Sequence, residues 1–125
     1  SLGDLSDEDT PGPISNPDGI RNQLEGAALH GVSRTIAEEV TWDDQKVTAV
    51  DWQTYRTLAV GTPVPAFETV LMDRPDVPAT GAGETAITGV AAAVGNAIFD
   101  ATGVRIRQVP FTPERVRAAI AARRT

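Results

Sequence analysis

A short glycine-rich stretch, Gly81-Ala82-Gly83-Glu84, divides the chain and constrains its fold more than any other feature. A proline-rich connection precedes it at residues 74–78, and an alanine-rich stretch without proline follows at 85–103. Because glycine has no Cβ, residues 81 and 83 could adopt positive φ and let the backbone approach another group closely. The pattern predicts a turn that presents Glu84 at the head of a helix, where the helix dipole stabilises a carboxylate. On these residues alone, capping of an ordinary helix explains Glu84 better than a functional role does.

Two further helices have clear start signals. Asn16-Pro17-Asp18-Gly19 marks a turn and a helix start, and apolar residues then recur at helical spacing to about residue 33. Gly26 and Gly31 in this helix predict close approach to a neighbouring element. Thr112-Pro113-Glu114 combines a capping hydroxyl, a proline at the first helical position and an acid in the first turn, which predicts a helix over 113–123.

Several segments have the composition of β-strands. The predicted strands are 36–42 and 46–52, joined by a turn, then 67–72 and 105–109. Trp42 and Trp52 are interpreted as packing groups of the first two strands rather than as a stacking platform. The predicted fold class is therefore α+β, with about three helices packed on a small, mainly antiparallel sheet. Residues 1–15, acidic and rich in Gly, Pro and Ser, are predicted to form a flexible arm, and residues 16–125 the folded part.

Composition excludes several kinds of chemistry. The chain has no cysteine, which excludes disulfides and iron–sulfur ligation within it. The single histidine, His30, rules out a two-histidine metal site and is interpreted as an ordinary helical residue, so no metal ligands are predicted. Residues 1–20 hold five acidic and no basic residues, whereas 103–125 hold six arginines and one glutamate. The arginines are interpreted as a solvated helix face; a surface that binds another subunit stays open, and no nucleic-acid partner is expected.

No apolar run approaches the roughly 18 residues that a membrane helix needs. No signal-peptide pattern opens the sequence either. We therefore expect no membrane span and a cytoplasmic location, with a periplasmic location left open.

Four stretches, taken together, resemble one protein family. They are NPDGIRNQLEG at 16–26, GAGE at 81–84, NAIFDATGVRIR at 96–107 and VPFTPERV at 109–116. In order and spacing they resemble the C-terminal end of the molybdopterin-binding large subunit of molybdenum hydroxylases. This is the xanthine dehydrogenase/aldehyde oxidase family, and the isoquinoline 1-oxidoreductase and nicotinate dehydrogenase type looks most similar. The resemblance covers residues 12–122, so residues 16–125 are expected to be the C-terminal portion of a molybdopterin-binding domain.

The resemblance implies a role for each matching residue. Glu84 would be the catalytic base, taking a proton from a Mo-bound hydroxyl that attacks an N-heteroaromatic or aldehyde substrate. Gln23, Gly81, Ala82 and Gly83 would contact the cofactor, a molybdopterin expected in the form of a molybdenum pterin dinucleotide and shared with sequence outside this chain. Iron–sulfur clusters would lie in a partner domain or subunit. The expected partners are the remainder of the large subunit, the iron–sulfur subunit and a small-molecule substrate.

The chain also departs from the family. Relatives of this kind run to several hundred residues, so most cofactor-binding loops and the substrate channel would lie elsewhere, and the isolated chain is expected to be inactive. The segment before residue 12 lacks the apolar strand of the family, and Thr85 replaces a common proline or alanine. The chain could be a fragment, a separately encoded piece or a repurposed domain. The alternative function is a non-catalytic interaction domain that retains the fold without the cofactor.

Overall fold

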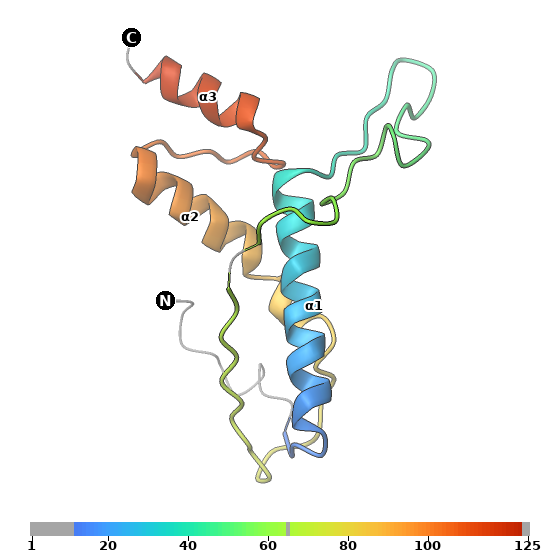
Figure 1. Ribbon diagram of the computed structural model, residues 1–125, viewed down its shortest axis with the longest axis vertical. Coiled ribbons are helices and arrows are strands. Elements are labelled where there is room, and N and C mark those ends of the chain that lie inside the picture. The colour runs from blue at the N-terminus through green and yellow to red at the C-terminus, as the bar shows by residue number, and fades with distance from the viewer. Residues whose placement is uncertain (1–11, 65, 124–125) are drawn as a thin grey trace.

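The fold is built on one long helix. The computed structural model describes residues 12–64 and 66–123. Its elements are the α-helix α1 (Pro17–Ile36), the 3₁₀ turn η2 (Thr85–Ile87), and the α-helices α2 (Val90–Thr102) and α3 (Pro113–Ala122). In Figure 1, α1 follows the long axis, α2 and α3 lie to one side of its C-terminal half, and the chain after α1 extends to the other side. The arrangement is open rather than layered.

Local capping explains where α1 and α3 begin. The side chain of Asn16 accepts a hydrogen bond from the N–H of Gly19 at 2.9 Å, and Pro17 follows at the first helical position. The hydroxyl of Thr112 accepts from the N–H of Arg115 in the same way at 3.3 Å, ahead of Pro113. The predicted start signals are confirmed, and α1 runs three residues further than its apolar spacing indicated.

Gly31 sets the contact between α1 and α2. A Cβ on Gly31 would lie 2.7 Å from Cγ2 of Val90, the first residue of α2, which is closer than side chains can approach. The close approach predicted at Gly31 is confirmed. Gly26, in contrast, has no neighbour within 4 Å of such a Cβ. Of these two glycines, only Gly31 is therefore in close contact with α2.

A small cluster around Phe111 links the C-terminal end of α1, the middle of α2 and the start of α3. Phe111 is 7% exposed, and its N–H donates to the carbonyl of Thr35 at 2.7 Å. A Cβ on Gly95 of α2 would lie 3.4 Å from the Phe111 ring. Nearby, the guanidinium of Arg115 in α3 pairs with the carboxylate of Glu39 at 2.7 Å. This cluster is the core of the described chain, and it is small.

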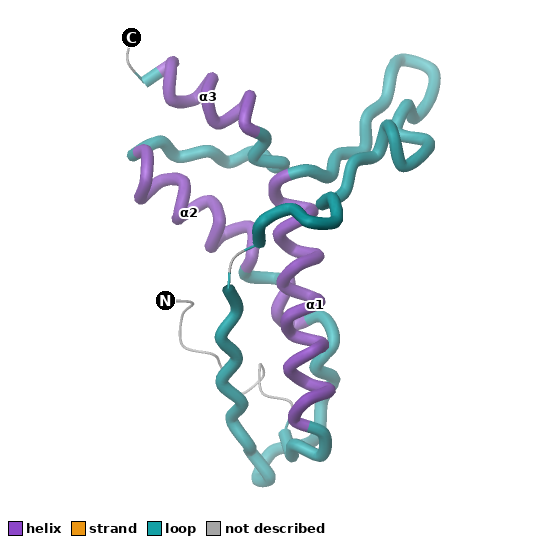
Figure 2. Tube along the Cα trace, viewed as in Figure 1, coloured by secondary structure: helices purple, strands orange, loops and turns teal. Residues whose placement is uncertain are grey.

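The predicted fold class is wrong. The described residues form helices and turns and contain no β-strand, so the fold is helical rather than α+β (Figure 2). The expected hairpin is reduced to one antiparallel bridge between Trp42 and Val47. Residues 67–72 and 105–109 have no assigned strand. A strand needs hydrogen-bonding partners, and a two-stranded ribbon alone is only marginally stable, so extended sequence without further strands remains irregular.

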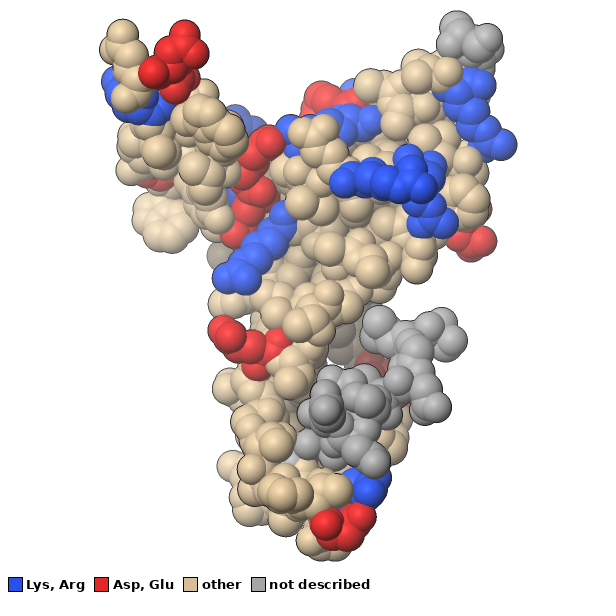
Figure 3. All heavy atoms as spheres, turned by 180° about the vertical axis from the view of Figure 1, so that it is seen from behind, with Lys and Arg blue, Asp and Glu red and all other residues tan. Residues whose placement is uncertain are grey.

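Many of the large apolar residues of the predicted strands stay exposed. Trp42 is 73% exposed and Trp52 is 82% exposed, so their expected packing is absent from the described structure. Other large apolar side chains with at least 44% exposure are Val40, Val47, Val50, Val60, Val64, Val70, Met72 and Val109. Figure 3 shows acidic and basic side chains interspersed on one face, with wide areas that carry neither.

The molecule exposes far more surface than a folded monomer of its mass. Its accessible surface is 9290 Å², whereas a compact protein of 13.2 kDa exposes about 6,400 Å². The predicted arm at residues 1–15 lies mostly outside the described residues, and its boundary stays a prediction. Within the described part, no helix is long and apolar enough to cross a membrane.

Candidate functional site

The fold brings Gln23 and Glu84 to one cavity. The cavity has a volume of about 290 Å³ and lies between α1 and the loop that precedes η2. The residues that line it are Gln23, Gly26, Ala27, His30, Arg34, Gly83, Glu84 and Ile87. The amide nitrogen of Gln23 lies 3.6 Å from the position that a Cβ on Gly83 would take. Two of the sequence-predicted motifs, 61 residues apart, therefore meet here.

Glu84 does not stand at the head of the alanine-rich helix, as the sequence predicted. It immediately precedes the three-residue turn η2, and α2 begins only at Val90. Its side chain makes no capping hydrogen bond. The residue is exposed, and its carboxylate has no hydrogen bond or ion pair within the described residues. Helix capping therefore does not explain this glutamate.

The glycines of the loop do not have the positive φ that the sequence suggested. Positive φ occurs at Gly12, Gly61 and Gly103 among the described residues, and not at Gly81 or Gly83. A Cβ on Gly81 would meet nothing within 4 Å, and one on Gly83 would make only an ordinary contact with Gln23. Neither backbone conformation nor neighbouring described atoms require glycine at these positions. The loop leaves room for a group that is outside this chain.

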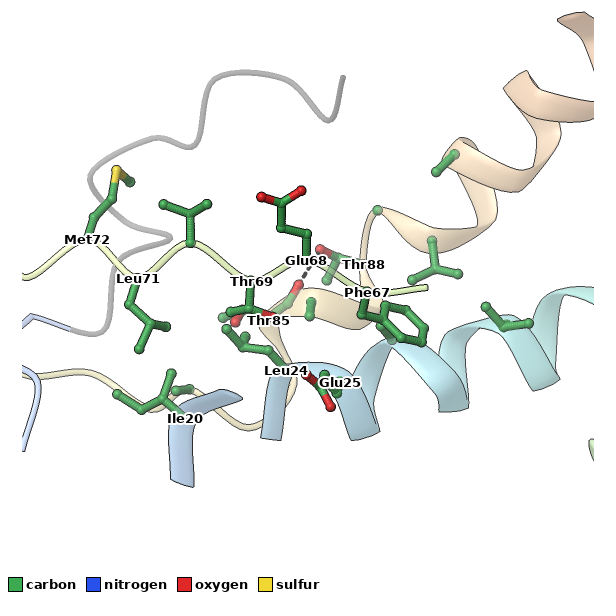
Figure 4. Close-up of a pocket in the computed structure, with 18 of the residues that line it drawn as sticks. Ile20, Leu24, Glu25, Phe67, Glu68, Thr69, Leu71, Met72, Thr85 and Thr88 are labelled. Atoms are coloured by element: carbon green, nitrogen blue, oxygen red, sulfur yellow. Dashed lines mark hydrogen bonds between the residues drawn. The ribbon is translucent and has the colours of Figure 1, made fainter. Parts of the chain in front are cut away.

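The loop divides the predicted site residues between two hollows. Gly83 and Glu84 line the cavity with Gln23, whereas Gly81 and Ala82 line a larger apolar groove of about 740 Å³. This groove lies between α1, the extended residues 67–72 and the start of α2. Figure 4 shows Leu24 and Leu71 pointing into it from opposite walls. The loop is thus the partition between a polar cavity and an apolar groove.

His30 and Arg34 also line the Glu84 cavity, and sequence reasoning missed both. Together with Gln23 and Ala27 they repeat every three or four residues, which places them on one face of α1. That spacing was visible in the sequence once Gln23 had been singled out. The cavity therefore combines one carboxylate with an amide, an imidazole and a guanidinium.

The cavity is not a self-contained metal site. No group of three or more His, Cys, Asp or Glu side chains able to hold a metal occurs among the described residues. What the side chains can do is accept a proton, at Glu84, and donate or accept hydrogen bonds, at Gln23 and His30. A cofactor here would have to carry its own metal ligands or receive them from other protein segments, and the open loop at Gly81 and Gly83 is compatible with such a group.

Comparison with known proteins gives consistent results. A nicotinate dehydrogenase subunit of Pseudomonas putida is 40% identical over 109 residues, which are 87% of this chain and 9% of that protein. The aldehyde oxidoreductase molybdenum-binding subunit of Escherichia coli is 34% identical over 112 residues, 84% of this chain and 15% of that protein. No protein-family model matches the chain.

Fold comparison agrees with sequence comparison. The crystal structure of quinoline 2-oxidoreductase from Pseudomonas putida matches with a TM-score of 0.75 and 28% identity, over 90% of this chain and 15% of that one. The chain thus spans between 9% and 15% of the length of these relatives. By sequence over most of its length and by fold, the chain belongs with the molybdenum hydroxylases and corresponds to a small part of their molybdenum-binding subunit.

Proposed function

We propose that this chain contributes the general base to the active site of a molybdenum hydroxylase, and that Glu84 is this base. The complete enzyme includes sequence outside the chain and hydroxylates an N-heteroaromatic compound or an aldehyde. The names of the relatives support this substrate class, since they include a nicotinate dehydrogenase and an aldehyde oxidoreductase.

One observation carries the proposal. Glu84 and Gln23 line the same cavity, and the Glu84 carboxylate has no partner among the described residues. Because no group of the described chain occupies the Glu84 carboxylate, it is available to a group bound in the cavity. The unpartnered carboxylate beside a loop of small residues suits a reaction centre that other segments complete.

Glu84 acts by accepting a proton. A general base must be ionised at the working pH and lie within hydrogen-bond reach of the proton that it removes. Both carboxylate oxygens of Glu84 are free to receive a hydrogen bond from a group bound in the cavity. When bound, the molybdopterin cofactor supplies the redox chemistry of hydroxylation. Glu84 takes up the proton that the attacking oxygen loses and returns it to solvent through the exposed side of the cavity.

The remaining residues position and accommodate the cofactor. The amide of Gln23 offers both a donor and an acceptor beside Gly83. The backbone at Gly81, Ala82 and Gly83 adjoins the cofactor closely, because no large side chain stands on the loop. The rest of the molybdenum-binding subunit supplies the other cofactor contacts. Iron–sulfur clusters belong to a partner domain or subunit, since this chain has no cysteine.

The Glu84→Gln substitution in the assembled enzyme tests the proposal. Loss of a general base should lower kcat by a factor on the order of 10²–10⁴, while molybdenum content and thermal stability stay unchanged. The matched control is Glu114→Gln, which makes the same chemical change at an exposed position in α3 and should leave kcat unchanged. An undiminished rate in the Glu84 variant at full molybdenum content would remove Glu84 from the mechanism.

A further inference from the structure

The cavity that Glu84 lines also contains a cationic side chain, which the proposed reaction does not use. Arg34 of α1 is exposed and lines this cavity. Its guanidinium has no hydrogen bond or ion pair with the residues that the structure describes. Arginine keeps its charge at ordinary pH and offers five N–H donors in a planar fork. The cavity therefore holds a permanent positive charge with unused donors.

The acidic residue nearest to Arg34 in sequence does not occupy it. Glu38 follows Arg34 by four residues, a spacing at which opposite charges on a helix can pair. The Glu38 carboxylate instead accepts a hydrogen bond from the Tyr55 hydroxyl at 2.7 Å. This hydrogen bond raises the pKa of Tyr55, while the charge of Arg34 acts in the opposite direction. Arg34 is thus available to an anion that the described chain does not supply.

His30 adds a hydrogen-bond donor on the same wall of the cavity. It lies four residues before Arg34, on the same face of α1. Its imidazole donates a hydrogen bond even when neutral, and it has no hydrogen-bond partner within residues 12–64 and 66–123. Helical side chains lean towards the N-terminus of their helix, so His30 and Arg34 favour directions towards the Glu84 end. One oxyanion could receive hydrogen bonds from both.

The negative and positive charges lie towards different ends of the cavity. Gln23 adjoins Gly83, with its amide nitrogen 3.6 Å from the position of an added Cβ, and Glu84 follows directly. Arg34 comes eleven positions after Gln23 on α1, which is about 16 Å along the helix axis. A molecule whose reacting carbon lies beside Glu84 can therefore place an anionic group near Arg34, away from the Glu84 carboxylate.

We propose that Arg34 and His30 form a subsite for a carboxylate of the substrate, so that the enzyme acts on a heteroaromatic or aldehyde acid. This inference rests on the proposed function, because that function places the reacting carbon beside Glu84. The guanidinium donates two parallel N–H bonds to the carboxylate oxygens, and the imidazole donates a third. The volume of about 290 Å³ suits a small molecule, since ligand pockets begin at about 300 Å³.

A carboxylate fits the charges of the cavity better than a phosphate group of a cofactor does. Arg34 and Glu84 are the charged side chains that line it, and their charges cancel when the imidazole is neutral. A carboxylate adds one negative charge, whereas a phosphate monoester adds about two beside the Glu84 carboxylate. A protein carboxylate from outside the chain would match the charge, but it would fix Arg34 as part of the assembly rather than of the substrate site.

Two probes that differ in charge test the inference on the assembled, molybdenum-containing enzyme. Pyridine-3-carboxylate and pyridine-3-carboxamide share one ring, and titration calorimetry gives the Kd of each. The carboxylate should bind at least about tenfold more tightly, because hydrogen bonds to a charged group are stronger than neutral ones. Arg34→Gln should remove this preference and leave the Kd of the carboxamide unchanged, whereas Arg34→Lys should keep part of it. Equal affinity for both probes, or a preference that survives in Arg34→Gln, would overturn the inference.

Arg21→Gln is the matched control. Arg21 is on the same helix and pairs with Asp18 at 3.1 Å, and it does not line the cavity. Its variant should keep the preference for the carboxylate. Loss of molybdenum from Arg34→Gln alone would assign the guanidinium to the cofactor, and loss of assembly would assign it to a protein carboxylate. Either result would overturn the substrate subsite.

Glu84→Gln separates this inference from the proposed function. The variant keeps Arg34 and His30, so the preference for the carboxylate should persist or increase as a repelling charge is lost. If Glu84→Gln retained both the preference and full kcat, the base would be disproved and the anion subsite would stand. If it lost kcat while wild-type enzyme bound both probes equally, the base would stand and the subsite would be disproved.

Discussion

Gly81 and Gly61 are both exposed glycines with open space where a Cβ would be, but only Gly61 has a positive φ, of 84°. The backbone explains glycine at position 61, because other residues rarely adopt that conformation. Nothing in the described chain explains glycine at position 81. A residue that the local structure does not require is a candidate for contact with a group outside the chain.

Gly81→Ala should therefore lower cofactor retention without destabilising the fold. An added methyl group meets no described atom, so the thermal midpoint of the assembled protein should hold or rise slightly. The molybdenum content per mole of protein should fall if the cofactor adjoins the loop as proposed, because the methyl group adds bulk to a loop otherwise made of small residues. Gly61→Ala should give the opposite pattern, with stability reduced by roughly 1 kcal/mol and molybdenum content unchanged. Full molybdenum content in Gly81→Ala would show that the loop has spare room.

Asp76 is the residue whose ionisation the structure alters most clearly. The hydrogen bonds from the Arg74 guanidinium, joined by a backbone N–H, lower the pKa of Asp76 from 3.8 to about 2. Since the folded state favours the carboxylate, this contribution is present above about pH 4 and is lost as the pH falls towards 2. Carboxyl-carbon NMR should show the low pKa, and Arg74→Gln should raise the pKa towards 3.8. Arg21→Gln, on α1, should leave the Asp76 titration where it is.

At the scale of elements, the contact between α1 and α2 depends on one missing side chain. Gly31→Ala would place a methyl group 2.7 Å from Val90, and overpacking of this kind costs about 1–3 kcal/mol. Gly26→Ala, on the same helix without a neighbour within 4 Å, should instead gain up to about 1 kcal/mol from helix propensity. Urea unfolding of the assembled protein measures both. A stabilised Gly31 variant would show that the helices can separate without loss.

The sequence predicted helices well and strands badly, for a physical reason. Helix starts depend on local contacts, such as the Asn16 cap of Gly19 and the Thr112 cap of Arg115, so the information lies within a few residues. Strands depend on partners, and residues 67–72 have none within the described chain. The strand predicted for these residues was wrong, because a sheet cannot form without a second strand to pair with.

The site was only partly predictable for the same reason. The resemblance to the family's motifs identified Gln23 and Glu84 as candidate site residues, and both line one cavity. Their meeting depends on how α1 packs beside η2, which no local pattern encodes. His30 and Arg34 join them because helical spacing continues the face begun by Gln23, and a systematic search of that face would have found them. Gly81 and Ala82 line the apolar groove on the other side of the loop. The sequence composition does not determine which side of the loop they face.

At the scale of the whole molecule, the described chain has little interior. Phe111 is its only buried large apolar side chain among the described residues, while the accessible surface reaches 9290 Å². Large exposed apolar areas commonly mark surfaces that another segment or protein covers. The open shape in Figure 1, with the Glu84 cavity and the apolar groove on either side of a single loop, agrees with the proposal that segments outside this chain complete the site.

The fluorescence of the two exposed tryptophans can report on their surroundings. Trp42 and Trp52 are its only two tryptophans, and both lie on the projecting segment between α1 and the 67–72 segment. At 73% and 82% exposure their indoles are in water, so we expect their emission to be that of solvated tryptophan. Neither lines the Glu84 cavity or the groove. The ultraviolet fluorescence of this chain therefore responds to what covers the projecting segment and is insensitive to proton transfer at Glu84.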